Sequence, residues 1–149
     1  MNLRPLFRAE ITLAPAQEFG ATPAGRRRVI PITGGRFSGE RLSGRVLPGG
    51  ADWQVIRADG VADLDARYTL ETADGALIYI RNKGYRHGPD EVMKRLAAGE
   101  AVDPTLYYMR STPWFETGDA RYAWLNRIVC LGRGARRAAA VEFDFFEVL

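Results

Sequence analysis

Apolar and polar residues alternate along most of this chain, which is the pattern of strands that bury one face. The first alternating stretch covers residues 3–13 and places six side chains on one side: Leu3, Pro5, Phe7, Ala9, Ile11 and Leu13. A second strand is predicted at residues 26–33, where Pro31 cannot donate to a ladder and indicates an edge or a bulge. The chain is therefore expected to begin with β-structure.

Glycines punctuate the next segment, residues 34–50, at positions 34, 35, 39, 44, 49 and 50. Apolar residues lie between these glycines, so the segment does not have the composition of a flexible linker. Glycine accepts the positive φ values that bulges and barrel corners require. The segment is therefore predicted to form short strands that bend sharply at glycines.

Two Asp-Gly pairs separate the following alternating segments. Asp59-Gly60 and Asp74-Gly75 divide residues 52–58, 64–72 and 76–83, and Asp-Gly between alternating segments is a strong hairpin signal. A β-meander is expected here. Three more strands are predicted farther along the chain, at residues 104–112, 121–131 and 138–148.

One segment has helical signals. In residues 88–99, Pro89 suits a first helical turn and Gly99 supplies a stop. The apolar Val92, Met93 and Leu96 are expected to face a barrel end that the helix covers. With roughly eight to ten strands, the predicted fold is an all-β, closed antiparallel β-barrel with one short helix, formed by residues 1–149 as a single domain.

The charge balance gives little reason to expect a polyanionic partner. The chain has 21 Lys and Arg residues against 18 Asp and Glu residues, for a formal net charge of +3. Two basic clusters, residues 26–28 and residues 133–137, could contact phosphates, but no aromatic-basic RNA-binding motif or recognition-helix pattern accompanies them. Nucleic-acid binding is therefore not expected, and neither is a membrane partner.

The residues that hold most metals and covalent cofactors are scarce. Cys130 is the single cysteine and His87 the single histidine, which excludes an internal disulfide, a thiolate cluster and a histidine metal cluster. No cofactor and no metal are predicted. The sequence has no signal-peptide core and no apolar run long enough for a membrane span, so a cytoplasmic location is expected.

Four phrases resemble a known family. They are GGRFSGERLSGRVLPGGADWQ from residue 34, LDARYTLETADGALIYI from residue 64, DPTLYYMRSTPWFETGD from residue 103 and RYAWLNRIV from residue 121. They are similar to a bacterial and fungal family known as uncharacterised proteins, or a domain of unknown function. The resemblance implies a compact antiparallel β-barrel that is often oligomeric, and it brings no established activity to any residue.

Several predicted strand faces combine large aromatic side chains with a few polar groups, which is typical of a small-molecule pocket. The first functional hypothesis is a barrel pocket that binds a small aromatic or apolar acidic metabolite, with arginine binding its anionic group. Alternatively, the aromatic residues are core and the arginines pack at the rim. The predicted ligand-binding residues are Arg67, Tyr79, Tyr108, Arg110, Trp124 and Asn126.

Two other functions stay open on the sequence. One is a cofactor-independent enzyme, an isomerase, cyclase or lyase, with Glu116 or Asp52 as base, Tyr79 as acid and an arginine opposite the developing negative charge. Trp114 and Phe115 would desolvate Glu116, and an Asp52–Arg67 pair could also be purely structural. The other is a self-assembling structural or interaction domain, which would form a homo-oligomer.

Overall fold

The computed structural model describes residues 1–149, in which ten strands form one sheet. A single α-helix, α1 (Asp90–Ala97), and two short 3₁₀ helices, η1 (Pro104–Leu106) and η2 (Ala123–Arg127), connect or cover the strands. The strands are β1 (Leu3–Leu13), β2 (Gln17–Thr22), β3 (Gly25–Ser38), β4 (Ser43–Val46), β5 (Ala51–Ile56), β6 (Ala62–Thr72), β7 (Leu77–His87), β8 (Tyr108–Glu116), β9 (Cys130–Arg136) and β10 (Ala140–Val148).

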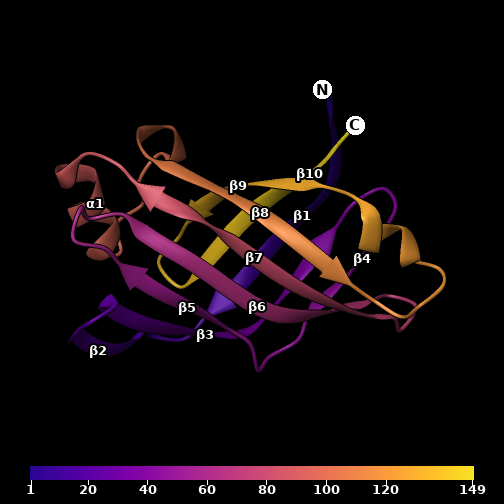
Figure 1. Cartoon of the computed structure of the whole chain (residues 1–149), viewed down its shortest axis with the longest axis horizontal. Coiled ribbons are helices and arrows are strands. Elements are labelled where there is room, and N and C mark those ends of the chain that lie inside the picture. Colours follow the sequence, from indigo (N-terminus) through magenta and orange to yellow (C-terminus); the bar gives the residue numbers. More distant parts are fainter.

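The sheet closes on itself (Figure 1). Antiparallel neighbours run in the order β1, β10, β9, β8, β7 and β6, and β3 then pairs with β1 to complete the circle. Between β6 and β3, the short strands β4 and β5 fill one position in succession, because each pairs with both neighbours. The ten strands thus form a closed eight-position barrel, with β2 outside it on β3, and the predicted fold class is confirmed.

The glycine-rich segment bends as predicted. β3 pairs with β5 before residue 32 and with β1 and β4 beyond it, and Gly34 and Gly35 have φ values of 151° and 137° at this corner. A Cβ on Gly35 would lie 2.1 Å from the carbonyl oxygen of Glu10. Glycine is therefore needed at the corner both for its backbone angles and for the close approach of β1.

Both Asp-Gly hairpins are confirmed, with φ values of 83° at Gly60 and 90° at Gly75. The predicted strand at residues 121–131 is wrong over its first half. Residues 123–127 form η2, because Leu125 is buried against the end of the barrel, and β9 starts only at Cys130. Strand β2 was not predicted, since its exposed side chains give no apolar face.

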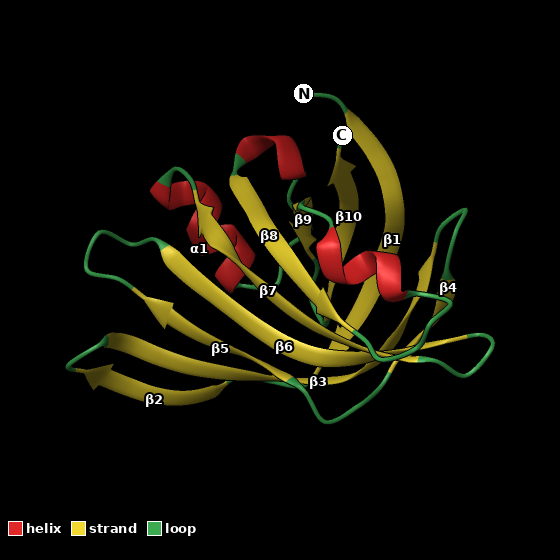
Figure 2. Ribbon diagram, turned by 45° about the vertical axis from the view of Figure 1, so that its right-hand side comes forward, coloured by secondary structure: helices red, strands yellow, loops and turns green.

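The two ends of the barrel have different covers, α1 at one and η2 at the other (Figure 2). As predicted, Val92, Met93 and Leu96 of α1 pack against the core. An aromatic cluster fills the interior toward the η2 end, where Phe7 lies 5.0 Å from Phe145 and 5.9 Å from Phe115 between ring centroids. None of the helices has the length and hydrophobicity needed to cross a bilayer.

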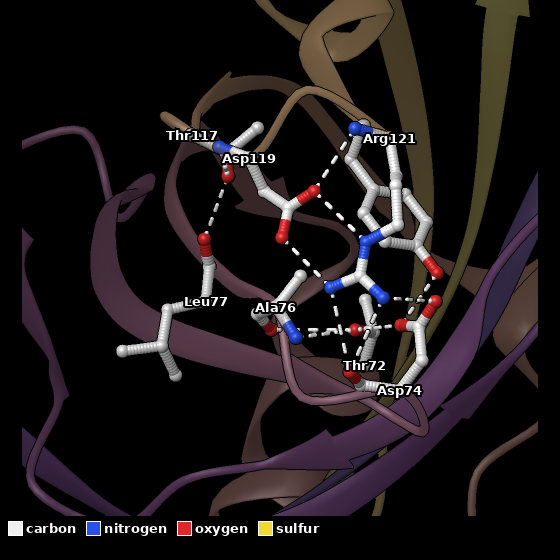
Figure 3. Close-up of polar contacts among 8 residues, drawn as sticks. Thr72, Asp74, Ala76, Leu77, Thr117, Asp119 and Arg121 are labelled. Atoms are coloured by element: carbon white, nitrogen blue, oxygen red, sulfur yellow. Dashed lines mark hydrogen bonds and ion pairs between the residues drawn. The ribbon is translucent and has the colours of Figure 1, made fainter.

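A polar network fastens the loops at the η2 end (Figure 3). The guanidinium of Arg121 contacts the carboxylates of Asp119 and Asp74 at 2.8 and 3.0 Å, and Thr117 Oγ1 donates to the carbonyl of Leu77 at 2.8 Å. These contacts join the β6–β7 hairpin to the loop between β8 and η2. The loops at the η2 end, which we call the closed end, are therefore tied together above the buried Leu125 of η2.

Candidate functional site

A cavity lies inside the barrel at the α1 end, with a volume of about 40 Å³. Its walls are mostly aliphatic and aromatic side chains from β1, β3, β6, β8 and β10. Six polar side chains from β5, β6, β7 and β9 also reach it: Asp52, Gln54, Tyr68, Asn82, Arg86 and Arg136. We call this space the lumen cavity. Its mixture of apolar walls and a few polar groups is typical of small-molecule sites, but its volume is smaller than that of most such sites.

Strand alternation explains which side chains reach the lumen cavity. On β6, Leu64 and Tyr68 share one face and are buried. Arg67 lies on the opposite face and is exposed. On β7, Ile80 and Asn82 are buried by the same alternation. Side chains two residues apart share a face of the sheet, so each strand contributes one inward set.

Asp52 is the acidic group of the lumen cavity. Its Oδ1 accepts a hydrogen bond from the backbone N–H of Asp65 at 2.9 Å, and its Oδ2 accepts one from Gln54 Nε2 at 3.0 Å. Burial of the carboxyl raises its pKa above the ordinary value, despite these hydrogen bonds and the positive charge of Arg86. The carboxyl therefore holds its proton to a higher pH than an exposed aspartate does.

Arg86 and Arg136 bring positive charge to the same space. Burial, followed by repulsion from Arg136, lowers the pKa of Arg86 to about 10. Burial and the charge of Arg28 lower the pKa of Arg136 as well. Arg136 Nη1 donates to the carbonyl of Ala140 at 2.9 Å, while the Nε of Arg86 has no hydrogen-bond partner in the protein. Neither arginine is neutralised by a carboxylate within ion-pair distance.

Unpartnered polar atoms gather at this cavity. Four buried side-chain atoms of the protein lack a hydrogen-bond partner, and three of them belong to residues that line the lumen cavity: Tyr68 Oη, Asn82 Oδ1 and Arg86 Nε. The fourth is Ser111 Oγ. Because each such atom costs about 1–3 kcal/mol, native proteins keep few of them, and a cluster calls for an explanation.

Of the predicted site residues, Asp52 lies in the lumen cavity and five lie on the outer face of the barrel. Arg67 contacts Asp65 at 3.3 Å and does not pair with Asp52. The other four outward-facing residues are Tyr79, Tyr108, Arg110 and Glu116, of which Tyr79 and Glu116 face each other across β7 and β8. None of the five points into the barrel, because each occupies the outward parity of its strand, and Tyr108 and Arg110 instead line a recess on the outer face.

Trp124 and Asn126 lie in η2, at the opposite end of the barrel from the lumen cavity. The guanidinium of Arg41 stacks over the Trp124 ring at 4.1 Å. Asn126 accepts from the backbone N–H of Thr117 and donates to its carbonyl, both at 2.9 Å. These contacts stabilise the closed end and do not bring the two residues to the cavity.

The predicted site residues did not include five that line the lumen cavity: Gln54, Tyr68, Asn82, Arg86 and Arg136. The alternation that carries Asp52 inward also carries Gln54, which is 1% exposed. Arg86 was overlooked because the predicted strand stopped at residue 83, whereas β7 continues to His87. All five side chains belong to the inward-facing set of their strands. A prediction with the correct strand ends could therefore have found them by alternation.

The single histidine and the single cysteine do not line the lumen cavity. His87 is exposed and stacks on Tyr108 with ring centroids 4.8 Å apart. Burial raises the pKa of Cys130 to about 12, so its thiol is not activated. No group of three His, Cys, Asp or Glu side chains is arranged to hold a metal ion.

Comparison with known proteins places this barrel among similar chains. A family model described as "Protein of unknown function (DUF3237)" matches residues 1–148. A UPF0311 protein of Rhodopseudomonas palustris is 48% identical over 149 residues, covering 100% of this chain and 97% of the relative. The crystal structure of a β-barrel-like protein from Acinetobacter baumannii has a TM-score of 0.86 and 49% identity, covering 98% of this chain and 94% of that one.

A fungal relative carries an enzyme name. The "Hydroalkoxylation enzyme phnH" of Penicillium herquei is 29% identical over 131 residues, which covers 88% of this chain and 72% of the relative. A crystal structure described as an enzyme from the same fungus has a TM-score of 0.74 at 24% identity, covering 99% of this chain and 94% of that one. This second likeness concerns the fold.

Proposed function

This chain belongs to the DUF3237 family, as its resemblance predicted, and we propose that its barrel binds a small aromatic or apolar acidic molecule in the lumen cavity. The observation that carries the proposal is the set of three unpartnered buried polar groups, on Tyr68, Asn82 and Arg86, beside a single apolar-walled cavity. A ligand with suitable oxygens would supply the hydrogen bonds that the protein itself does not.

The chemistry of the lining describes the ligand. Aliphatic side chains such as Ile11 and Ile32, with the ring of Phe143, favour an aromatic or aliphatic body. The guanidinium of Arg86 favours an anionic oxygen, since arginine binds carboxylates through directed, charge-assisted hydrogen bonds. Tyr68 Oη and Asn82 Oδ1 can accept a hydrogen bond from a ligand hydroxyl. A hydroxylated aromatic acid combines these features.

Titration calorimetry and thermal shift with benzoate, 4-hydroxybenzoate and cinnamate test the proposal. Binding should raise the melting temperature, and the stabilisation should grow with the logarithm of the ligand concentration once that concentration exceeds Kd. Arg86→Met should weaken binding by about tenfold or more, because it removes the buried cation but retains the apolar stem. Arg110→Met, on the outer face of β8, is the matched control. If no aromatic acid stabilises the protein, or if both variants lose affinity equally, the proposal fails.

A second candidate is acid–base catalysis in the same cavity. Two observations favour it: the raised pKa of the Asp52 carboxyl, and the name of the fungal relative. Hydroalkoxylation forms one C–O and one C–H bond while an O–H bond and the π-bond of an alkene break. The reaction therefore needs only proton movement, for which Asp52 would serve as proton donor and acceptor and Arg86 as the partner of a developing oxyanion.

Ring closure of 2′-hydroxychalcone to flavanone is a convenient assay, since it is an internal hydroalkoxylation followed by loss of visible absorbance. Wild-type protein should accelerate the reaction, and Asp52→Asn should reduce that acceleration by about a hundredfold or more. Glu116→Gln is the control, because Glu116 lies outside the barrel. Equal rates for the wild type and Asp52→Asn would contradict catalysis by Asp52.

A further inference from the structure

Next to the lumen cavity is a larger recess of about 220 Å³, which we call the mouth. Four arginines from three strands line it: Arg26 and Arg28 from β3, Arg86 from β7 and Arg136 from β9. Met93 and Leu96 of α1 form part of its apolar wall. Arg86 and Arg136 line both spaces, so the mouth and the lumen cavity meet at these two side chains.

We propose that the mouth binds a dianionic oxyanion, of the class of a phosphate monoester, carried by the molecule whose apolar part enters the lumen cavity. This inference rests on the proposed function and adds a second subsite to it. Apolar side chains make up most of the lining of the lumen cavity, whereas four arginines line the mouth. A compact ring or chain would therefore point inward and the charged group would lie under α1.

The charge count at the mouth supports a ligand with more than one negative charge. Arg28 pairs with Glu18 at 3.0 Å and donates to Gln54 at 3.1 Å. Arg26 and Arg86 have no carboxylate partner, and the polar contacts of Arg136 are with a carbonyl and with the hydroxyl of Tyr107. Four guanidinium groups thus line the mouth, and only that of Arg28 is paired with a carboxylate. Asp52, the one acidic side chain of the adjoining lumen cavity, brings at most one further negative charge.

Such an excess of like charge is costly where water is partly excluded. Repulsion among Arg28, Arg86 and Arg136 contributes to the lowered pKa values of the two buried arginines. A carboxylate would neutralise one of the three unpaired charges, whereas a phosphate monoester would neutralise up to two and offers three acceptor oxygens. The arrangement therefore favours a dianion over a monoanion.

The shape of the mouth favours a small ligand over a nucleic acid. A backbone-binding surface presents arginines along an open face that a polymer can follow. Here the arginines converge from three strands onto one recess, with apolar residues of α1 on its wall. A single terminal phosphate group fits this geometry, while a continuous phosphate backbone would have to leave the recess in two directions.

The experiment compares phenyl phosphate with benzoate by titration calorimetry, using the full chain. Phenyl phosphate should bind about tenfold more tightly or better, and its affinity should fall more steeply with salt. Arg26→Gln should weaken the binding of phenyl phosphate more than that of benzoate and so remove most of that advantage. Arg26 is exposed and makes no ion pair, so its loss should not impair folding. Arg27→Gln is the matched control, because Arg27 follows in sequence but donates to the carbonyl of Trp53 and does not line the mouth.

Equal affinity of the two ligands, with benzoate still bound, would overturn the dianion site and leave the lumen proposal standing. Equal effects of Arg26→Gln and Arg27→Gln would overturn it as well, because the selectivity would then be a general effect of surface charge. Failure of both ligands to bind would reject the lumen site and the mouth together. A short single-stranded oligonucleotide that binds more tightly than phenyl phosphate would assign the arginines to a polymer.

Discussion

Gln54 donates a hydrogen bond to Asp52 through its side-chain amide, at 3.0 Å, and its carbonyl accepts one from Arg28 at 3.1 Å. The buried amide thus connects the acid of the lumen cavity to an arginine of the mouth. Gln54→Leu should raise the pKa of Asp52 further, because one hydrogen bond to the carboxylate is lost. It should also cost about 1–3 kcal/mol of stability.

Carbon-detected NMR titration of the Asp52 carboxyl measures the pKa change, and urea unfolding measures the stability change. Gln17→Leu, on the exposed strand β2, is the control and should alter neither quantity. A pKa of Asp52 that falls in Gln54→Leu would contradict the role given to this hydrogen bond.

The raised pKa of Asp52 predicts the direction of one pH effect on stability. A folded carboxyl whose pKa lies above the unfolded value of about 3.8 contributes stability at low pH, and this contribution is lost as pH rises through the folded pKa. Asp52→Asn should abolish that loss. Melting temperatures of both proteins from pH 4 to pH 8 should therefore show a difference that shifts in favour of the variant as pH rises. A constant difference would show that Asp52 does not titrate in this range.

Replacement of Tyr68 should weaken ligand binding without lowering the stability of the protein. Its buried hydroxyl has no partner, so Tyr68→Phe should leave stability unchanged or raise it by up to about 1 kcal/mol, while weakening binding of hydroxylated aromatic acids. Tyr107→Phe is the contrasting variant, because the Tyr107 hydroxyl accepts a hydrogen bond from the backbone N–H of Arg136 at 2.8 Å. Its removal should cost about 1 kcal/mol. Equal destabilisation by the two variants, measured in urea, would disprove the distinction.

Arg121 should make the closed end sensitive to acid. Hydrogen bonds from Arg121 lower the pKa of Asp119 to about 2, so the stability they provide is present above about pH 3.8 and is lost as pH falls toward 2. Arg121→Met should therefore melt at a lower temperature than wild type at pH 6, and the gap should narrow at pH 2.5. Arg127→Met, at the end of η2, controls for loss of surface charge. A gap that widens in acid would refute this assignment.

Gly44 should be far less replaceable than Gly118. A Cβ on Gly44 would lie 2.0 Å from the carbonyl oxygen of Glu71, whereas a Cβ on Gly118 would have no neighbour within 4 Å. Gly44→Ala should cost more than about 2 kcal/mol, because β4 would have to move away from β6, and Gly118→Ala should stay within about 0.5 kcal/mol. Urea unfolding of both variants compares the two costs directly.

Local signals predicted most of the barrel. These signals were the alternation in residues 3–13, the two Asp-Gly hairpins and the helix start at Pro89. In each case the structure of the element is decided by residues close together in the sequence. Residues 121–127 could not be assigned in this way, because Leu125 gains more by closing the barrel end than it would as part of a strand. Tertiary burial decided the local structure there.

The candidate site was harder to predict because β6 and β7, taken together, place aromatic and basic residues on both faces of the sheet. Arg67 and Tyr68 are adjacent in sequence, and either could have lined a pocket on composition alone. Closure of the sheet selects Tyr68, and that choice depends on pairings between strands distant in sequence, such as β1 with β3 and β10. Asp52 was predicted because it lies beside Trp53, a bulky aromatic neighbour that a solvated hairpin would not need.

Strand β2 is the one strand of the sheet that pairs on a single side, so it is an edge strand. An unpaired strand edge can pair with a strand of another molecule and start aggregation. The exposed ring of Phe19 adds to that risk. The register shift between Glu18 and Gly20 interrupts the row of free backbone groups that an incoming strand would need. Straightening this short stretch, by removing the irregularity, would turn a stable barrel into a template for aggregation.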